Sequence, residues 1–502
     1  MISFLNNFFN FILVSIFALV FRLMRRIIES NMRFFTCLGH PAIQPLLEKV
    51  GCIKAYEIYL KAKKNCPAYQ QFLLEYSQTP PRSPNQLSYL PETNKENYIK
   101  KYSIEQRCWQ GKIPDCGVVI DESSGSSGTP NNWVRGIEER RAIKRNIQIS
   151  YALLFNQPRF FLINCFALGP WATGMNVSMS LVDVAILKSV GPDKSKIENT
   201  LKVFGNHYRY LIMGYPPFMK DFVETTTLNL KDYELHLIVG GEGISEGLRS
   251  YFLKFFKTVH SSYGASDLEI NIGVETELTI ALRKICFANP SLSQKIFGRE
   301  DVPMIFQYNP ADYVIERSPQ GELIFTITRL ANAAPKIRYN IKDLGGVVTI
   351  RHLITLLKSA NVNLNDLAER YLAFPILFTY GRNDLSAPFY GAKIFPSDIQ
   401  HILDNDEKLI ANYASHRIKV REDDQLNKTL IVALEKSVNI KEQFENEFLK
   451  DIFYQRLKTI NQDFREVSKL FTKDQLVIEQ YDFGQGPFAV KDIRVKNKYF
   501  LD

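Results

Sequence analysis

The sequence contains no cysteine pair with the C-x-x-C spacing that is typical of zinc and redox sites. Its seven cysteines are odd in number and lie far apart, from Cys37 to Cys286. This distribution argues against both a disulfide framework and a zinc cluster. We therefore expect reduced thiols in a cytosolic compartment.

The chain also lacks a dense positive charge. Lys and Arg number 62 against 53 Asp and Glu, so a net charge of +9 is spread over 502 residues. This is too dilute for the basic surface of a nucleic-acid binder, and we expect no nucleic-acid partner. A mildly basic surface suits acidic membranes and anionic substrates. The length and the 45% hydrophobic content predict two or three domains with large cores.

The N-terminal residues lack the features of a cleaved signal peptide. An apolar run covers 8–21, no Lys or Arg precedes it, and no small-residue cleavage site follows it. Arg22, Arg25 and Arg26 follow the run and favour retention of the remaining chain in the cytoplasm. We expect residues 1–30 to form a hydrophobic helix that anchors the protein to the inner face of the membrane. A helix that packs on the protein's own surface, or that pairs two subunits, is the alternative.

Short apolar runs alternate with helical stretches between residues 160 and 280, as in "RFFLINCFALG" and "YELHLIVGGEG". This alternation predicts an α/β core. The later segments "GELIFTITRL" and "FPILFTYGRND" have the hydrophobic alternation of antiparallel strands. From residue 382 the chain becomes charged and helical around one strand, "KTLIVALE". We predict an α/β fold with a large N-terminal domain of mixed sheets and helices over 31–381 and a small α+β domain over 382–502.

The stretch "DESSGSSGTP" at 121–130 joins a predicted strand, 118–120, to a predicted helix that begins at Ile137. Backbone N–H groups and hydroxyls in such a loop can bind a polyphosphate, and a helix N-terminus adds partial positive charge. The loop has no closing lysine, so it is not a Walker-type P-loop. On its own it is equally typical of a flexible loop.

Five further segments follow the loop in order: "IVGGEGISEGLR", "SSYGASDLEINIG", "GELIFTITRLANAAPKIRYNIKDLGG", "YGRNDLSAPFYGAKIFPSDIQ" and "GPFAVKDIRV". This ordered set resembles the adenylate-forming superfamily of acyl-CoA synthetases, luciferases and peptide-synthetase adenylation domains. Within it, the chain looks most like the phenylacetate-CoA ligase branch, over about residues 55–495.

The resemblance implies an ATP-dependent, AMP-forming acid–thiol ligase that uses ATP, Mg²⁺ and CoA. A carboxylic acid would be activated to an acyl-adenylate and then transferred to CoA. Transfer to a carrier-protein thiol or an amine is one alternative, and a catalytically degenerate nucleotide-binding protein is another. The resemblance also implies that the small C-terminal domain is mobile and rotates between the two half-reactions.

The nucleotide site that the resemblance implies has several parts. The β- and γ-phosphates would contact Ser123, Ser124, Gly125, Ser126, Ser127, Gly128 and Thr129. Asn131 stands where many family members have a lysine, and Arg135 could supply the missing charge. The adenine would lie between two segments, made of Gly240, Gly241 and Glu242 and of Tyr263, Gly264, Ala265 and Ser266. Asp267 replaces the usual glutamate and would bind Mg²⁺.

Ribose and the small domain account for the remaining roles. Asp343 would accept both ribose hydroxyls, Arg382 would contact ribose and phosphate, and Asp384 would be the hinge. Gly391 lies in the loop that family members turn toward the thiol acceptor. Lys491 would contact the carboxylate and the α-phosphate as a mobile cation.

Three further features of the sequence bear on these roles. Lys496 and Lys498 are alternatives to Lys491, because Val490 stands where the family has a glycine. Together with Asn131 and Asp267, Val490 is one of three departures that favour the degenerate alternative. Trp171, Tyr215 and Phe218 are candidates for the acyl pocket, although core packing explains such residues equally well.

Overall fold

The computed structural model describes residues 16, 32–77, 79–122, 131–155, 159–362, 372–382, 386–390, 392–423, 427–489 and 499–501. Nearly all of the predicted anchor, the Ser/Gly loop, Asp384, Gly391 and Lys491 lie outside these residues, so the predictions for them stay predictions. Among the helices that are described, none combines the length and the apolar character needed to cross a membrane.

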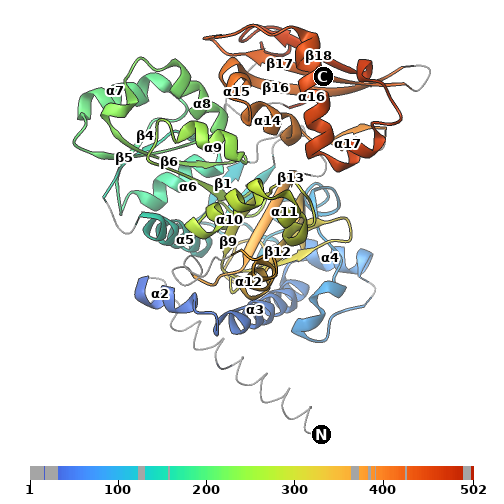
Figure 1. Ribbon diagram of the computed structural model, residues 1–502. Helices are drawn as coiled ribbons and strands as arrows, with labels where there is room; N and C mark the ends of the chain where they lie inside the picture. The colour runs from blue at the N-terminus through green and yellow to red at the C-terminus, as the bar shows by residue number, and fades with distance from the viewer. Residues whose placement is uncertain are drawn as a thin grey trace.

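A mixed sheet organises the described part of residues 161–382 (Figure 1). Its strands lie in the order β10-β11-β12-β13-β9-β8-β7-β6-β5-β3-β4. The parallel half contains β3 (Phe161–Asn164), β4 (Ile186–Ser189), β5 (Arg209–Gly214), β6 (Glu234–Gly240) and β7 (Thr258–Tyr263). The antiparallel half contains β8 (Gly273–Val274), β9 (Met304–Tyr308), β10 (Tyr313–Arg317), β11 (Glu322–Ile327), β12 (Tyr339–Val348) and β13 (Ile376–Arg382). The fold class is therefore α/β, with the mixed sheet that the sequence predicts.

The helices around this sheet begin at local sequence signals. Those before and between the strands of the parallel half are α2 (Met32–Leu38), α3 (Gln44–Asn65), α4 (Pro67–Tyr76), α5 (Ile137–Phe155), α6 (Ala172–Leu181), α7 (Lys194–Phe204), α8 (Pro216–Thr225) and α9 (Glu246–Phe252). Those of the other half are α10 (Glu277–Ala288), α11 (Pro290–Phe297) and α12 (Ile350–Ser359). Asp193 caps α7 by accepting from Lys196 N at 3.1 Å, and Ser245 caps α9 by accepting from Leu248 N at 3.0 Å. Proline opens α8, where its missing N–H costs nothing.

The Ser/Gly loop does not lead directly into a helix. A second strand, β2 (Asn132–Arg135), follows it and pairs antiparallel with β1 (Val119–Glu122). The loop therefore connects two paired strands, and α5 begins only at Ile137. Trp133 and Val134 are both buried, and this burial holds β2 against the core. The expected strand–loop–helix arrangement is corrected on this point.

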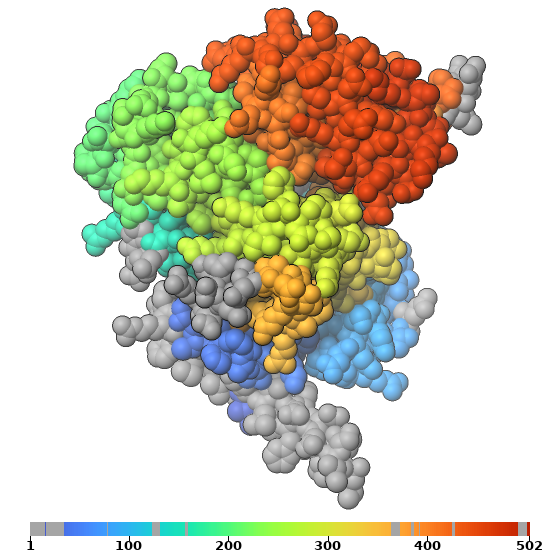
Figure 2. All heavy atoms as spheres, viewed as in Figure 1, coloured from blue at the N-terminus to red at the C-terminus, as the bar shows by residue number. Residues whose placement is uncertain are grey.

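The C-terminal unit, residues 387–501, has two sheets, β14-β15 and β16-β17-β18, and its own apolar core. Its strands are β14 (Ala387–Phe389), β15 (Ala392–Ile394), β16 (Tyr413–Glu422), β17 (Lys428–Lys436) and β18 (Leu476–Tyr481). Its helices are α14 (Pro396–Asp404), α15 (Glu407–Asn412), α16 (Asn446–Ile460) and α17 (Gln462–Val467). Ile418 on β16 also exchanges backbone hydrogen bonds with Tyr499 and Leu501, so the chain returns to this sheet. Figure 2 shows the unit in orange and red, resting on the green and yellow segments of the large unit, residues 32–382.

Specific polar contacts join the two units. The Ser245 hydroxyl donates to Asp404 Oδ2 at 2.8 Å, and Lys220 Nζ donates to the carbonyl oxygen of Tyr413. A Cβ built at Gly247 would lie 2.1 Å from the Asp404 carbonyl oxygen, so only glycine allows this approach. These contacts help to hold the C-terminal unit against the large unit.

One of these contacts predicts a pH dependence of stability. Burial raises the pKa of Asp404 to about 6, although Lys220, Ser245 and Gln400 act in the opposite direction. The protonated acid is thus preferred in the docked state, and docking weakens as the pH rises from the carboxyl's ordinary pKa toward 6. Asp404→Asn is expected to raise the thermal midpoint by a few degrees at about pH 7.5. Calorimetry should show that the difference in thermal midpoint between Asp404→Asn and the parent protein becomes smaller toward pH 4. A difference in midpoint that stays constant with pH would show that Asp404 is not the responsible group.

Candidate active site

A cavity of about 570 Å³, here called the central cavity, opens at the carboxyl ends of the parallel strands. From β3 the chain moves to β4 on one side, and β5 then lies on the other side of β3. In open α/β sheets, ligands bind at such a reversal of strand order. Phe166, Met213 and Tyr215, which lie at or just after the ends of β3 and β5, line the cavity there.

The central cavity brings together most of the described site residues that the sequence predicts. These are Trp171, Tyr215, Gly240, Gly241, Glu242, Tyr263, Gly264, Ala265, Ser266, Asp267, Asp343 and Arg382. Phe218 is different, because its side chain is 2% exposed and packs within the apolar core around the parallel strands. Residues from the C-terminal unit, among them Gln400, His401 and Tyr499, complete the lining.

The Gly-Gly-Glu segment forms a turn directly after β6. Gly241 has φ +83°, a conformation that an L side chain rarely adopts. Glu242 Oε2 accepts a 2.6 Å hydrogen bond from the hydroxyl of Tyr499. A residue close to the C-terminus thus reaches the segment predicted to border the adenine. Sequence reasoning missed Tyr499, which lies beyond the last recognisable motif.

Asp343 lies between an aromatic donor and a cation. The Tyr263 hydroxyl donates to Asp343 Oδ2 at 2.6 Å, and Asp343 and Arg382 are opposite each other in the pairing of β12 with β13. Burial, together with the nearby Asp343 carboxylate, raises the pKa of Tyr263 well above its ordinary value. The phenol therefore stays protonated and keeps the carboxylate in a fixed orientation. The Tyr263 ring packs on Phe306 and Phe325, with centroid distances of 5.5 and 6.3 Å.

Asp267 is held in a similar way by a second tyrosine. The Tyr339 hydroxyl donates to Asp267 Oδ2 at 2.8 Å. Within the described ranges, no group of three or more His, Cys, Asp and Glu side chains is placed to hold a metal ion. Mg²⁺ is usually bound by one or two carboxylates together with substrate phosphates, so a single aspartate fits this mode of binding.

Arg135 is buried and does not face the cavity as a free charge. Its side chain is 2% exposed, and Nη1 forms an ion pair with Glu139 at 2.8 Å. It also donates to the carbonyl oxygens of Ser266 and Leu268. The idea that Arg135 replaces a phosphate-binding lysine is therefore not supported by its position. Its charge instead fixes the backbone on both sides of Asp267.

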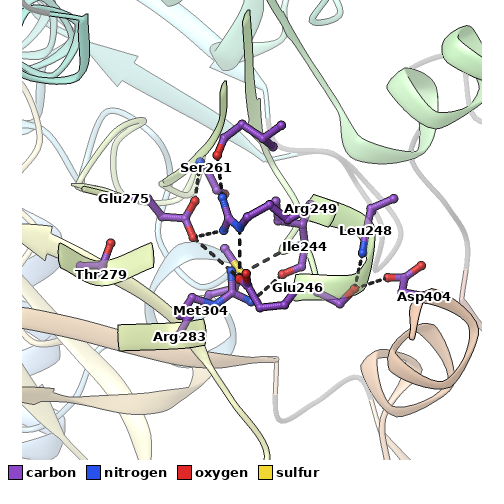
Figure 3. A network of polar contacts seen from close by, with 12 residues as sticks. Ile244, Glu246, Leu248, Arg249, Ser261, Glu275, Thr279, Arg283, Met304 and Asp404 are labelled. Carbon is purple, nitrogen blue, oxygen red and sulfur yellow. Dashed lines mark hydrogen bonds and ion pairs between the residues drawn. The ribbon is translucent and has the colours of Figure 1, made fainter. Parts of the chain in front are cut away.

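A second buried ionic network supports the other wall of the site (Figure 3). Glu275 accepts from Ser261 N at 2.7 Å and forms ion pairs with Arg249 and Arg283 at 2.5 and 3.1 Å. Burial opposes ionisation of Glu275, but the two guanidinium groups hold its pKa below the ordinary value. Arg283 also donates to Ile244 O at 2.7 Å. The network thus ties β7 to the turn that follows the Gly-Gly-Glu segment.

Gly264 provides a sharp test of the site's backbone. A Cβ at this position would lie 2.6 Å from Asn271 N and 2.7 Å from Glu269 O, and both are backbone atoms that cannot move away cheaply. Gly264→Ala is expected to destabilise the protein by about 1–3 kcal/mol and to reduce nucleotide binding, measured by denaturation and by ATP titration. Gly136→Ala is the matched control, because its Cβ would meet only ordinary contacts from 3.4 Å outward. Equal effects of the two changes would contradict this account.

No known protein-family model matches the chain, and no curated protein matches it in sequence. Its fold matches solved structures of 2-hydroxyisobutyryl-CoA ligase. The crystal structure of that enzyme in the postadenylation state, in complex with 2-HIB-AMP, has a TM-score of 0.64 at 14% identity and covers 92% of this chain and 90% of that chain. An open conformation with 2-HIB-AMP and CoA has a TM-score of 0.54 at 13% identity, over 92% and 91% of the two chains. The chain therefore has the fold of the adenylate-forming enzymes.

Proposed function

We propose that the protein is an ATP-dependent acid–thiol ligase, similar to phenylacetate-CoA ligase, that makes an acyl-adenylate and transfers the acyl group to CoA. One observation above all supports the proposal. Asp343, Tyr263 and Arg382 share a single cavity with the glycine-rich turn after β6, at the carboxyl ends of the parallel strands. The fold alone would not favour this activity, since one fold hosts many functions.

In the first half-reaction, a carboxylate oxygen of the acid attacks the α-phosphorus of ATP. The bond from that phosphorus to the bridging oxygen breaks, and pyrophosphate leaves. Asp343 would accept the two ribose hydroxyls, Arg382 would offset phosphate charge, and the Gly-Gly-Glu segment would border the adenine. Mg²⁺, when held by Asp267 and phosphate oxygens, supplies further neutralisation of charge. The loop 123–129 is proposed to hold the outer phosphates.

In the second half-reaction, a thiolate attacks the acyl carbon, a C–S bond forms and AMP leaves with its oxygen. The C-terminal unit contributes Pro396, Gln400 and His401 to one wall of the central cavity. Burial lowers the pKa of His401 to about 4, so its ring stays neutral near physiological pH. We propose that CoA approaches at this boundary. A carrier-protein thiol or an amine would need the same access, so the acceptor must be found by experiment.

The decisive experiment is acid-dependent exchange of labelled pyrophosphate into ATP across aromatic, short and long acids. Exchange followed by acyl-CoA formation supports the proposal. Exchange without CoA consumption, but with acyl transfer to a carrier protein or an amine, favours those acceptors. Binding of AMP with no exchange for any acid would instead indicate a degenerate nucleotide-binding protein.

A further inference from the structure

Beyond the residues proposed to bind the nucleotide, α5 and α6 both line a part of the central cavity that is here called the extension. Ile147, Ser150, Tyr151 and Leu154 line it from α5. They are spaced at i, i+3, i+4 and i+7, so they form a single face of that helix. Sequence reasoning found α5 but missed this face, because a cavity wall and a core-facing stripe have the same apolar pattern.

The opposite walls of this extension are also apolar. Val177 and Leu181, four residues apart on α6, line it together with Phe166, Met213 and Ile238. All five side chains are buried. Among the described residues that line the cavity from α5, α6, β3 and β5, none carries a charge. The charged lining residues lie on other elements, such as β12, β13 and the C-terminal unit, and Glu122, at the end of β1, pairs with Trp171 directly before α6.

The polar side chains that α5 contributes to the extension already have partners. Ser150 Oγ accepts from Asn271 Nδ2 at 3.0 Å, and Asn271 Oδ1 accepts from Ser262 Oγ at 3.0 Å. The Tyr151 hydroxyl is hydrogen-bonded by the backbone of Phe160. These groups therefore do not require a hydrogen bond from a ligand, and a polar ligand gains little there.

An aromatic cluster lies behind Tyr151. The Tyr151 ring packs on Phe155 and Phe160 at centroid distances of 5.7 and 6.2 Å, and Phe155 packs on His260 at 5.8 Å. Burial lowers the pKa of His260 to about 4, so this imidazole is uncharged near neutral pH. A cation, Arg209, lies beside this cluster, with its guanidinium 5.0 Å from the Phe160 ring centroid, but Arg209 does not line the cavity. A charged group at the far end of a ligand would therefore find no counter-ion in the α5 and α6 lining, and burying it would be costly.

We propose that the acid is a monocarboxylic acid with an uncharged, apolar tail, aliphatic or aromatic, and that the tail lies between α5 and α6. This inference rests on the proposed function for the identity of the reaction, but the binding of the tail can be measured without it. Leu181 and Val177 would limit the length or width of the tail, since their side chains form the α6 wall.

The test is a binding measurement in which bound cis-parinaric acid, a fluorescent apolar fatty acid, is displaced from the full chain by octanoate or suberate. The two competitors have the same chain length, but suberate carries a second carboxylate at the far end. Octanoate is expected to compete about a hundredfold better, because the second carboxylate would have to be buried without a partner. Equal competition by the two acids would overturn the inference.

Variants at one end of α6 locate the tail. Leu181→Trp should weaken octanoate binding by about tenfold or more, and Leu181→Ala should improve binding of longer acids. Val182→Trp is the matched control, because this neighbouring side chain is 55% exposed. An equal loss of octanoate affinity in Leu181→Trp and Val182→Trp would contradict the placement of the tail beside Leu181. Exchange of pyrophosphate is measured separately, so selective binding of octanoate without exchange would refute the proposed ligase while the inferred acid pocket stands.

Discussion

Asp343→Ala is expected to reduce acid-dependent pyrophosphate exchange by at least about a hundredfold. The carboxylate is held by the Tyr263 hydroxyl at 2.6 Å and is proposed to accept two ribose hydroxyls. A hydrogen bond to a charged group contributes about 1.5–3 kcal/mol, and about 1.4 kcal/mol corresponds to a factor of ten. Losing two such bonds accounts for the expected effect, to be measured as kcat/KM for ATP in the exchange assay.

Two comparisons make the Asp343 result specific. Asp115→Asn changes a carboxyl whose side chain is 81% exposed and should leave exchange unchanged. Tyr263→Phe removes only the hydroxyl that orients Asp343, so its effect should be smaller, about tenfold. If Asp343→Ala retained nearly full activity while folded, the ribose assignment would be wrong.

Lys491→Ala is expected to lower the adenylation rate by about a hundredfold or more while thioester formation from supplied acyl-adenylate remains. The proposed role of this lysine is to stabilise charge that develops only in the first half-reaction. The structure describes the residues that flank segment 490–498. Tyr499 lines the central cavity, and Phe488 is buried and contacts the Arg417 guanidinium at 5.1 Å from its ring centroid. The two half-reactions should be measured separately.

Lys496→Ala and Lys498→Ala are the internal comparisons for this result. If one of them, rather than Lys491→Ala, abolishes adenylation, the catalytic cation has been assigned to the wrong residue. If all three variants lose both half-reactions equally, the segment acts on folding or docking rather than on one chemical step. Circular dichroism of each variant separates that outcome from a catalytic defect.

Sequence patterns predicted the strands and helices whose apolar residues follow a regular local spacing. Strands β3 and β6 are almost wholly buried, and such strands read as continuous apolar runs. The short strand β2 was missed, because four residues after a glycine-rich loop carry too little pattern. As a result the sequence predicts that the loop precedes a helix, whereas in the structure it connects β1 to β2.

The ordered motifs of glycines and acids predicted residues that the structure brings into one cavity, whereas residues that are distant in the sequence and meet only after folding were not predicted. Arg249, Glu275 and Arg283 come together only after folding, and no local spacing reveals such a network. Arg135 was considered for phosphate binding from its position in the sequence, whereas its buried contacts show a structural role. The apolar pocket between α5 and α6 was also hidden, because lining and core residues have the same composition.

The pairing of residues 499–501 with β16 bears on how the segment before them is attached to the C-terminal unit. Phe488 and Tyr499, on either side of segment 490–498, both contact residues of the C-terminal unit. If that unit rotates between the half-reactions, as the resemblance implies, the ends of the segment rotate with it. Lys220 and Asp404 join the two units and do not line the central cavity. Substitutions at these positions should then alter the ratio of the rates at which the adenylate is formed and consumed. The contacts between the two units would then affect the rate of the proposed reaction from a distance.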